Sequence, residues 1–105
     1  MNDFSIHWTP FALERLDEIF EYIKHEAKSI TPAQKFIQKI LERSDQLKRF
    51  PLSGAKEPLL IETGQESRYL VISDFKIIYQ IENKDVIITD VFHTKQNPEK
   101  LKRKK

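Results

Sequence analysis

The sequence contains no cysteine and only two glycines. The lack of cysteine excludes disulfides, thiolate metal ligands and cysteine nucleophiles. Three scattered histidines do not make a convincing zinc site, so we expect no metal ion and no cofactor. No apolar run approaches the roughly 20 residues of a membrane span, and residues 1–4 lack the basic and then apolar layout of a secretory signal. We therefore expect a cytoplasmic protein that makes no contact with a membrane.

The residues that are present suffice for one globular domain. Of the 105 residues, 39% are hydrophobic and 32% are charged, which is enough to form a core and too patterned for a disordered chain. Five positive charges lie in the last six residues, so the formal net charge of +2 leaves about −3 for the rest of the chain. We predict a single domain over residues 1–98 and a basic, flexible tail over residues 99–105. The charge of the domain argues against a broad nucleic-acid-binding surface.

The first residues predict a strand that runs directly into a helix. Residues 4–8 alternate between apolar and polar side chains, as a half-buried strand does. Thr9 offers an N-cap hydroxyl, and Pro10 suits the first helical position. Apolar residues then recur every three or four positions as far as Ala27, which predicts an amphipathic helix of about five turns.

A second helix is expected to begin at Pro32. Thr31 and Gln34 have the spacing of a capping box, and the apolar stripe that follows continues to Phe50. Because only about three residues connect the helices, they should be antiparallel neighbours. The segment 51–66 is punctuated by Pro and Gly, which indicates a long connection with room for a short strand.

The last third of the chain predicts a meander of three strands. Residues 68–72, 75–81 and 86–92 are rich in β-branched and aromatic side chains, and turn residues separate them. The whole order indicates an α+β protein, in which a helical hairpin packs on one face of an antiparallel sheet and leaves the other face open. Alternation alone does not decide which polar side chains lie on the open face. The candidates are Arg68, Lys76, Gln80, Thr89 and His93.

Several stretches resemble the RelE/ParE superfamily of type II toxin–antitoxin toxins, whose fold is β-α-α-β-β-β. The resemblance is carried by Trp8-Thr9-Pro10 with Ala12, by Leu47 and Pro51–Gly54, by Arg68–Val71, by Lys76–Ile81 and by Val91–Pro98. The last stretch is the most specific, because its Val-aromatic-His-x-basic-Gln-Asn-Pro pattern is similar to ParE-type members, often described as plasmid stabilisation proteins. The resemblance implies growth inhibition by the free toxin and neutralisation by a cognate antitoxin.

The resemblance implies two alternative targets. ParE-like members bind DNA gyrase and poison it, which requires no catalytic group. RelE-like members are ribosome-dependent endoribonucleases, or mRNA interferases, that act on the ribosome and its mRNA. The sequence favours gyrase, because its basic residues are sparser than those of RelE-type sites. A third possibility is an inactive module that retains only antitoxin binding.

If the chain is a nuclease, its catalytic groups are expected to be His93, Arg68 and Lys95. Attack of a ribose 2′-OH on the adjacent phosphate needs a group that takes the proton, cations that stabilise the phosphorane and an acid for the leaving oxygen. An imidazole with a pKa near neutrality and two basic side chains supply these functions without a metal ion.

If the chain acts on gyrase, the segment after the last strand is expected to meet gyrase or its DNA, as the resemblance to ParE-like members implies. A basic tail would strengthen this contact in a salt-dependent way. The residues predicted to bind the target are Lys76, Lys95, Gln96, Asn97, Lys102 and Arg103.

Three of the singled-out residues also have plain structural interpretations. His93 at the end of a strand is able to donate to a backbone carbonyl and hold the loop that follows. Arg68 is able to pair with a surface carboxylate. Tyr79, which lies between Ile77 and Ile81 in a predicted strand, is interpreted as a core residue and not as a surface for stacking bases.

Overall fold

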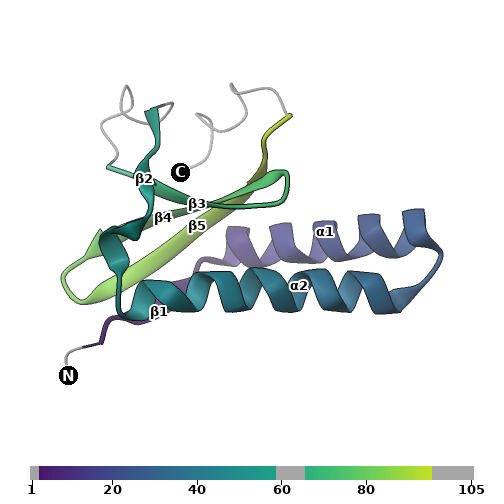
Figure 1. Cartoon of the computed structure of the whole chain (residues 1–105), viewed down its shortest axis with the longest axis horizontal. Coiled ribbons are helices and arrows are strands. Elements are labelled where there is room, and N and C mark those ends of the chain that lie inside the picture. The colour runs from purple at the N-terminus through teal and green to yellow at the C-terminus, as the bar shows by residue number, and fades with distance from the viewer. Residues whose placement is uncertain (1–2, 59–65, 96–105) are drawn as a thin grey trace.

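The computed structural model describes residues 3–58 and 66–95. In this part of the chain, an antiparallel pair of helices packs on one face of a five-stranded sheet, which gives the molecule two layers (Figure 1). The predicted α+β class is therefore confirmed. The elements are β1 (Ser5–Trp8), α1 (Pro10–Ala27), α2 (Ile30–Asp45), β2 (Ala55–Lys56), β3 (Arg68–Ile72), β4 (Phe75–Glu82) and β5 (Asp85–His93), with 3₁₀ turns at Gln46–Lys48 and Pro51–Ser53.

The sheet is mixed, although an antiparallel sheet was expected. Its strand order is β1-β5-β4-β3-β2, and β1 pairs with β5 in parallel while every other pair is antiparallel. Tight turns force antiparallel neighbours within the meander. The whole helical hairpin and the rest of the meander lie between β1 and β5 in the sequence, and a long connection of this kind permits the parallel pairing of these two strands.

The start of α1 forms as predicted, and the start of α2 does not. The hydroxyl of Thr9 accepts a hydrogen bond from the N–H of Ala12 at 3.0 Å, with Pro10 in the first turn. At the other end, Lys28 adopts a left-handed conformation with φ of 55° and reverses the chain. Ser29 then precedes α2, which begins at Ile30, two residues before the predicted start. Pro32 is accommodated because the first turn of a helix needs no N–H donors.

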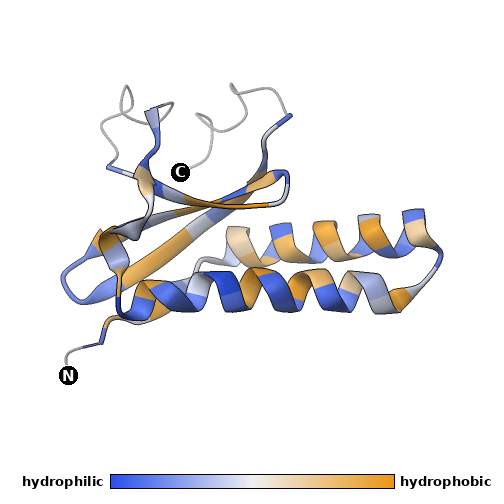
Figure 2. Ribbon diagram, viewed as in Figure 1, coloured by the Kyte–Doolittle hydropathy of each residue, from blue (hydrophilic) through white to orange (hydrophobic). Residues whose placement is uncertain are grey.

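The core lies between the helical hairpin and the sheet. Side chains that are fully buried there come from both layers: Ile40, Leu47, Ile77, Tyr79, Val86 and Ile88. The interpretation of Tyr79 as a core residue is confirmed. Hydrophobic residues recur along both helices and follow the strands (Figure 2). Leu13 and Leu41 belong to the predicted apolar stripes but are exposed. Phe50 is exposed as well, and it lies beyond the helix, because α2 ends at Asp45 and not at the predicted Phe50.

A β-bulge in β5 decides which side chains face the helices. Ile78 is opposite Asp90 and Tyr79 is opposite Ile88, so Thr89 is an extra residue in the ladder. An extra residue shifts all later side chains to the other face. Val91 therefore joins Ile88 on the helix-covered face, and His93 follows it.

The face of the sheet opposite the helices holds a second, smaller apolar cluster. It consists of Ile78 and Phe92, which are both buried, and of Tyr69, which is partly buried. Lys76 pairs with Phe92 across the strands and so lies on this face, as Gln80 does.

Candidate functional site

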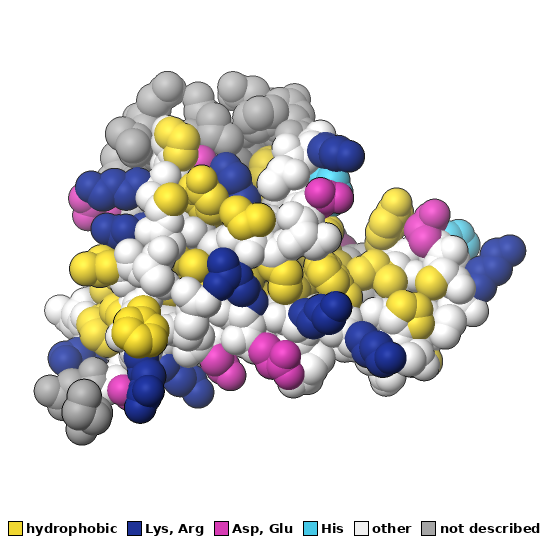
Figure 3. Space-filling model, in the orientation of Figure 1, with side chains coloured by type: hydrophobic (Ala, Val, Ile, Leu, Met, Phe, Trp, Pro, Cys, Tyr) yellow, Lys and Arg dark blue, Asp and Glu magenta, His cyan; other side chains and the backbone are white. Residues whose placement is uncertain are grey.

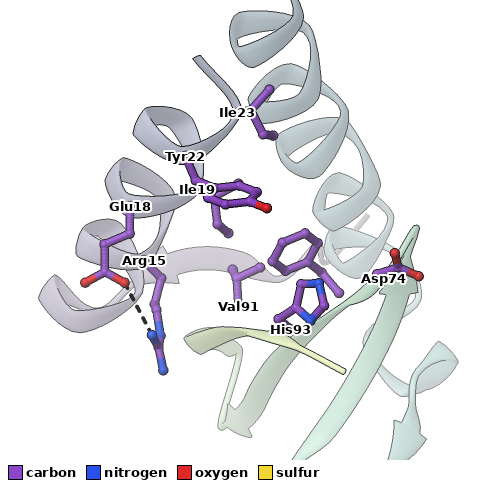
Figure 4. A pocket seen from close by; sticks show the side chains of 9 residues that line it. Arg15, Glu18, Ile19, Tyr22, Ile23, Asp74, Val91 and His93 are labelled. Carbon is purple, nitrogen blue, oxygen red and sulfur yellow. Dashed lines mark hydrogen bonds and ion pairs between the residues drawn. The ribbon is translucent and has the colours of Figure 1, made fainter. Parts of the chain in front are cut away.

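A pocket of about 540 Å³ opens between α1 and the end of β5. One wall comes from α1 and is lined by Arg15, Glu18, Ile19, Tyr22 and Ile23. The other wall comes from the sheet and is lined by Asp74, Phe75, Val91 and His93. Figure 4 shows the two walls facing each other, with the ring of Tyr22 reaching from α1 into the space between them. We call this space the groove.

The groove exists because the helical hairpin is longer than the sheet that it covers. Figure 1 shows that the far end of the hairpin extends beyond the strands, so the second half of α1 has only part of its apolar surface covered. Tyr22 is 66% exposed, although it lies one turn after the buried Ile19. Figure 3 shows hydrophobic side chains gathered in the notch between the sheet and the end of the hairpin. The exposed apolar surface and the concave shape are typical of a binding site.

Arg15 forms one charged edge of the groove. Its Nε donates to Oδ1 of Asp90 at 2.9 Å, and its Nη1 lies 3.3 Å from Oε1 of Glu18. The guanidinium also lies over the ring of Phe11, 4.9 Å from its centroid. The side chain of Arg15 is 14% exposed and that of Asp90 is 2% exposed, so this ion pair joins α1 to β5 in a largely buried setting.

His93 forms the opposite edge. Its ring packs edge-on against Phe75 at a centroid distance of 4.9 Å. Its Nδ1 accepts a hydrogen bond from the backbone N–H of Lys95 at 3.1 Å. The sequence had instead suggested that His93 donates a hydrogen bond to a backbone carbonyl. The bond requires an unprotonated Nδ1. His93 does hold the chain that leaves β5, but as an acceptor.

Arg68 lies at the other end of the sheet and holds a turn. Its Nη1 donates to the carbonyl of Gly54 at 2.8 Å and lies 3.5 Å from the carbonyl of Leu52. The expected surface carboxylate partner is therefore replaced by backbone. Arg68 is opposite Tyr79 in the ladder, so it shares the helix-covered face.

Tyr79 completes the same network. Its hydroxyl donates to the carbonyl of Pro51 at 2.6 Å and accepts from the N–H of Gly54 at 3.0 Å. Burial raises the pKa of Tyr79, and the Gly54 N–H and the charge of Arg68 oppose that rise. Gly54 has to be glycine, because a Cβ at this position would lie 2.6 Å from both the Tyr79 hydroxyl and the carbonyl oxygen of Tyr69.

Lys76 is held in an ion pair on the face opposite the helices. Its Nζ lies 2.9 Å from Oε1 of Glu57, whose side chain is fully buried, and 4.3 Å from the centroid of the Tyr69 ring. The buried carboxylate neutralises the ammonium group, so the predicted target contact of Lys76 would compete with this pairing. Sequence reasoning missed Glu57, because the segment around it carries no periodic pattern.

The three candidate catalytic residues do not share one site. Arg68 is level with Tyr79 and His93 is level with Phe75, four residues apart along β4. Residues advance about 3.4 Å each along a strand, so the two levels are about 14 Å apart. Lys95 lies beside His93 and is exposed. Gln96, Asn97, Lys102 and Arg103, like the predicted tail over 99–105, lie outside the described residues.

Two groove residues were missed by sequence reasoning. Arg15 lies among the polar residues of α1 in the sequence and was not singled out, but its side chain turns toward Asp90 in β5. Tyr22 was not singled out, and a large aromatic at the edge of an apolar stripe was the only signal that pointed to it.

The described ranges hold no metal cluster and no transmembrane helix. Within residues 3–58 and 66–95, no three His, Asp or Glu side chains gather in a way that would hold a metal ion. No helix in these ranges combines the length and the apolar character that crossing a bilayer requires.

The two helices packed on one face of a mixed five-stranded sheet agree with the RelE/ParE-like fold that the resemblance implied. Residues 6–98 match the family model of the ParE toxin of type II toxin–antitoxin systems, parDE, and the chain belongs to this family. Among solved structures, the chain is similar to one titled "Chromosomal ParDE TA system from P. aeruginosa". The TM-score is 0.72 and the identity 22%, over 90% of this chain and all of the other, so this likeness concerns the fold. No curated protein matches the chain.

Proposed function

We propose that this chain is the toxin of a type II toxin–antitoxin pair that acts in the cytoplasm, is neutralised by a cognate antitoxin and poisons DNA gyrase when free. The observation that carries the proposal is membership of the ParE toxin family over residues 6–98. A gyrase poison works by binding a surface and needs no catalytic constellation. The candidate catalytic residues His93, Arg68 and Lys95 do not share one site, which agrees with an action by binding alone.

The geometry supports gyrase over the ribosome. A nuclease would need its proton acceptor and its cations around one phosphate. Here the levels of His93 and Arg68 are about 14 Å apart along β4, by the rise of about 3.4 Å per residue. Arg68 is also committed to the carbonyl of Gly54, and Lys76 is committed to Glu57.

The groove is the proposed docking site of the antitoxin. Its apolar walls, from Ile19 and Ile23 on one side and Phe75 and Val91 on the other, suit an apolar side chain of a partner segment. The exposed ring of Tyr22 adds an aromatic contact of the kind that dominates protein interfaces. Antitoxin segments that order on binding would gain this apolar contact in exchange for their conformational entropy.

The test of the target is a gyrase supercoiling assay with the purified full chain. We expect inhibition that is accompanied by accumulation of cleaved DNA. The Lys102→Gln, Arg103→Gln double variant should weaken the inhibition in low salt, because it removes two predicted target contacts. The control is the Lys35→Gln, Lys39→Gln double variant, which makes the same charge change on exposed positions of α2.

Pulse labelling after induction in bacteria separates the two targets. The gyrase proposal predicts that DNA synthesis fails before protein synthesis, with the His93→Ala variant still toxic. Earlier failure of protein synthesis, together with loss of toxicity in His93→Ala, would instead assign the chain to the mRNA interferases.

A further inference from the structure

The chain that leaves β5 is fastened to the sheet wall of the groove. The backbone N–H of Thr94 donates to the carbonyl of Asp74 at 2.8 Å, and the N–H of Lys95 donates to Nδ1 of His93 at 3.1 Å. Both acceptors belong to residues that line the groove. The two residues that begin the C-terminal segment are thus attached to the surface on which a groove partner would lie.

The position of the His93 ring is set by the packing of that wall. The ring meets Phe75 edge-on at 4.9 Å, and Phe75 in turn packs against Phe36 of α2 at 5.6 Å. His93 is only partly buried, so its remaining surface faces the groove. The His93 ring therefore contacts the core through Phe75, its Nδ1 holds the exit of the chain, and the rest of the ring is accessible to a partner.

We propose that His93 is a positioning residue that couples occupation of the groove to the direction in which the chain leaves β5. The proposal rests on the proposed function, in which an apolar side chain of the antitoxin enters the groove and the segment after Lys95 meets the target. An occupant that packs on His93 immobilises the ring, and the immobilised Nδ1 holds the Lys95 N–H more firmly. Neutralisation then acts on the target-binding segment through the groove.

General thermodynamics limits how strongly a groove occupant is able to influence the exit of the chain. A groove occupant shifts the exit only if it binds the held state better than the released one. Coupling between two sites usually changes an affinity by about 5- to 150-fold, and the change is reciprocal. The hydrogen bond from the Lys95 N–H to Nδ1 of His93 defines the held state.

Two substitutions distinguish the contribution of the His93 ring from the contribution of its hydrogen bond. His93→Phe keeps an aromatic ring against Phe75 but has no acceptor. His93→Asn removes the ring but keeps an acceptor, because Asn side chains often bond the N–H two residues further on. In the free chain, we expect faster amide exchange at Lys95 in His93→Phe and near wild-type exchange in His93→Asn. This difference tests the hydrogen bond itself, and the labelling experiment below tests the coupling, which a purely structural role for His93 would not produce.

The coupling itself is testable without the antitoxin, because the chain has no cysteine. Tyr22→Cys places a single thiol at a 66% exposed position of the groove, and N-phenylmaleimide or N-benzylmaleimide then delivers an apolar occupant. Leu13→Cys, at a 50% exposed position of α1 outside the groove, carries the same labels as a control. Methyl resonances of Val91 report whether the label lies in the groove.

The label at position 22 should slow amide exchange at Lys95 by about fivefold or more, the lower end of usual coupling. It should have no such effect in the His93→Phe or His93→Asn background, and the label at position 13 should have none in any background. The proposal is overturned if the label at position 22 shifts the methyl resonances of Val91 while Lys95 exchange stays the same or accelerates. It is also overturned if neither the phenyl nor the benzyl label at position 22 shifts the Val91 resonances, because the groove then does not accept an apolar occupant. Failure of the unlabelled chain to inhibit gyrase would instead refute the proposed function and leave the Lys95 measurement valid.

Discussion

At the scale of single residues, Tyr79 connects the sheet to the turn that follows the helices. Its hydroxyl donates to Pro51 and accepts from Gly54, and Arg68 binds the carbonyl of the same glycine. These bonds satisfy backbone groups of a segment that has little regular structure of its own. The phenolic oxygen of one strand residue thus fixes the segment between the second helix and β2.

We expect Tyr79→Phe to lower the free energy of unfolding by about 1–3 kcal/mol, because it leaves the buried N–H of Gly54 without its acceptor. Urea denaturation at pH 7 measures the loss. Tyr22→Phe, at a position that is 66% exposed, is the matched control and should change stability little. Equal effects of the two substitutions would contradict the role assigned to the network.

The same tyrosine predicts a loss of stability at alkaline pH. Burial raises the pKa of Tyr79 above its ordinary value of 10.0, so the folded chain holds the phenolic proton more firmly than the unfolded chain. This contribution is complete below about pH 10 and declines as the pH rises toward the pKa of the folded state. Tyr79→Phe should therefore show a smaller fall in stability than wild type above about pH 10. Parallel curves for the two proteins would show that Tyr79 does not contribute.

At the scale of elements, two side-chain contacts fix the start and the middle of α1. The cap at Thr9 ties the start of the helix to its own first turn, and Arg15 ties its middle to Asp90 in the bulged strand. Because the sequence contains only two glycines, residues with side chains take the left-handed backbone conformation at some turns. Non-glycine residues adopt positive φ at three described turns: Lys28, Ser73 and Asn83.

The two helix starts predict different sensitivities to substitution. Thr9→Ala removes the hydroxyl that accepts from Ala12 and should cost about 1 kcal/mol of stability. Ser29→Ala should cost almost nothing, because the side chain of Ser29 makes no capping bond at the start of α2. Thermal or urea unfolding of the pair gives the comparison, and a larger cost at Ser29 would show that the caps have been assigned wrongly.

The ion pair between Arg15 and Asp90 predicts a larger effect. Arg15→Met keeps most of the apolar stem but leaves the carboxylate of Asp90, which is 2% exposed, without the guanidinium, at an expected cost of about 3–5 kcal/mol. Glu18→Gln breaks only the exposed partner of the same arginine and should stay within about 1 kcal/mol of wild type. Urea midpoints measure both, and similar values would mean that burial of the pair contributes nothing.

At the scale of the whole molecule, the hairpin and the sheet differ in extent, and the groove results from that difference. Tyr22 is therefore placed for contact with a partner and contributes little to the core. If the antitoxin binds in the groove, Tyr22→Ala should weaken its affinity by about tenfold or more. Leu13→Ala, on the same helix outside the groove, should leave the affinity unchanged. Titration calorimetry with the antitoxin checks both, and an unchanged affinity for Tyr22→Ala would move the antitoxin site elsewhere.

The amino-acid sequence by itself determined the α+β class, the strand at residues 68–72, the start of α1 and the resemblance to ParE toxins. These features depend on local periodicity, on capping and turn residues and on short motifs, which act over a few positions. The start of α2 was misplaced by two residues because Lys28 takes a left-handed conformation that no residue pattern announced.

Only the tertiary structure decided the faces and the partners of the functional candidates. One extra residue in β5 turned His93 toward the helices, since every side chain after a bulge changes face. Glu57 meets Lys76 because it directly follows β2, which pairs antiparallel with β3 beside β4, and the two residues are 19 positions apart in the sequence. The parallel pairing of β1 with β5 depends on the whole chain between them. Such long-range contacts follow from packing, and local sequence patterns carry no record of them.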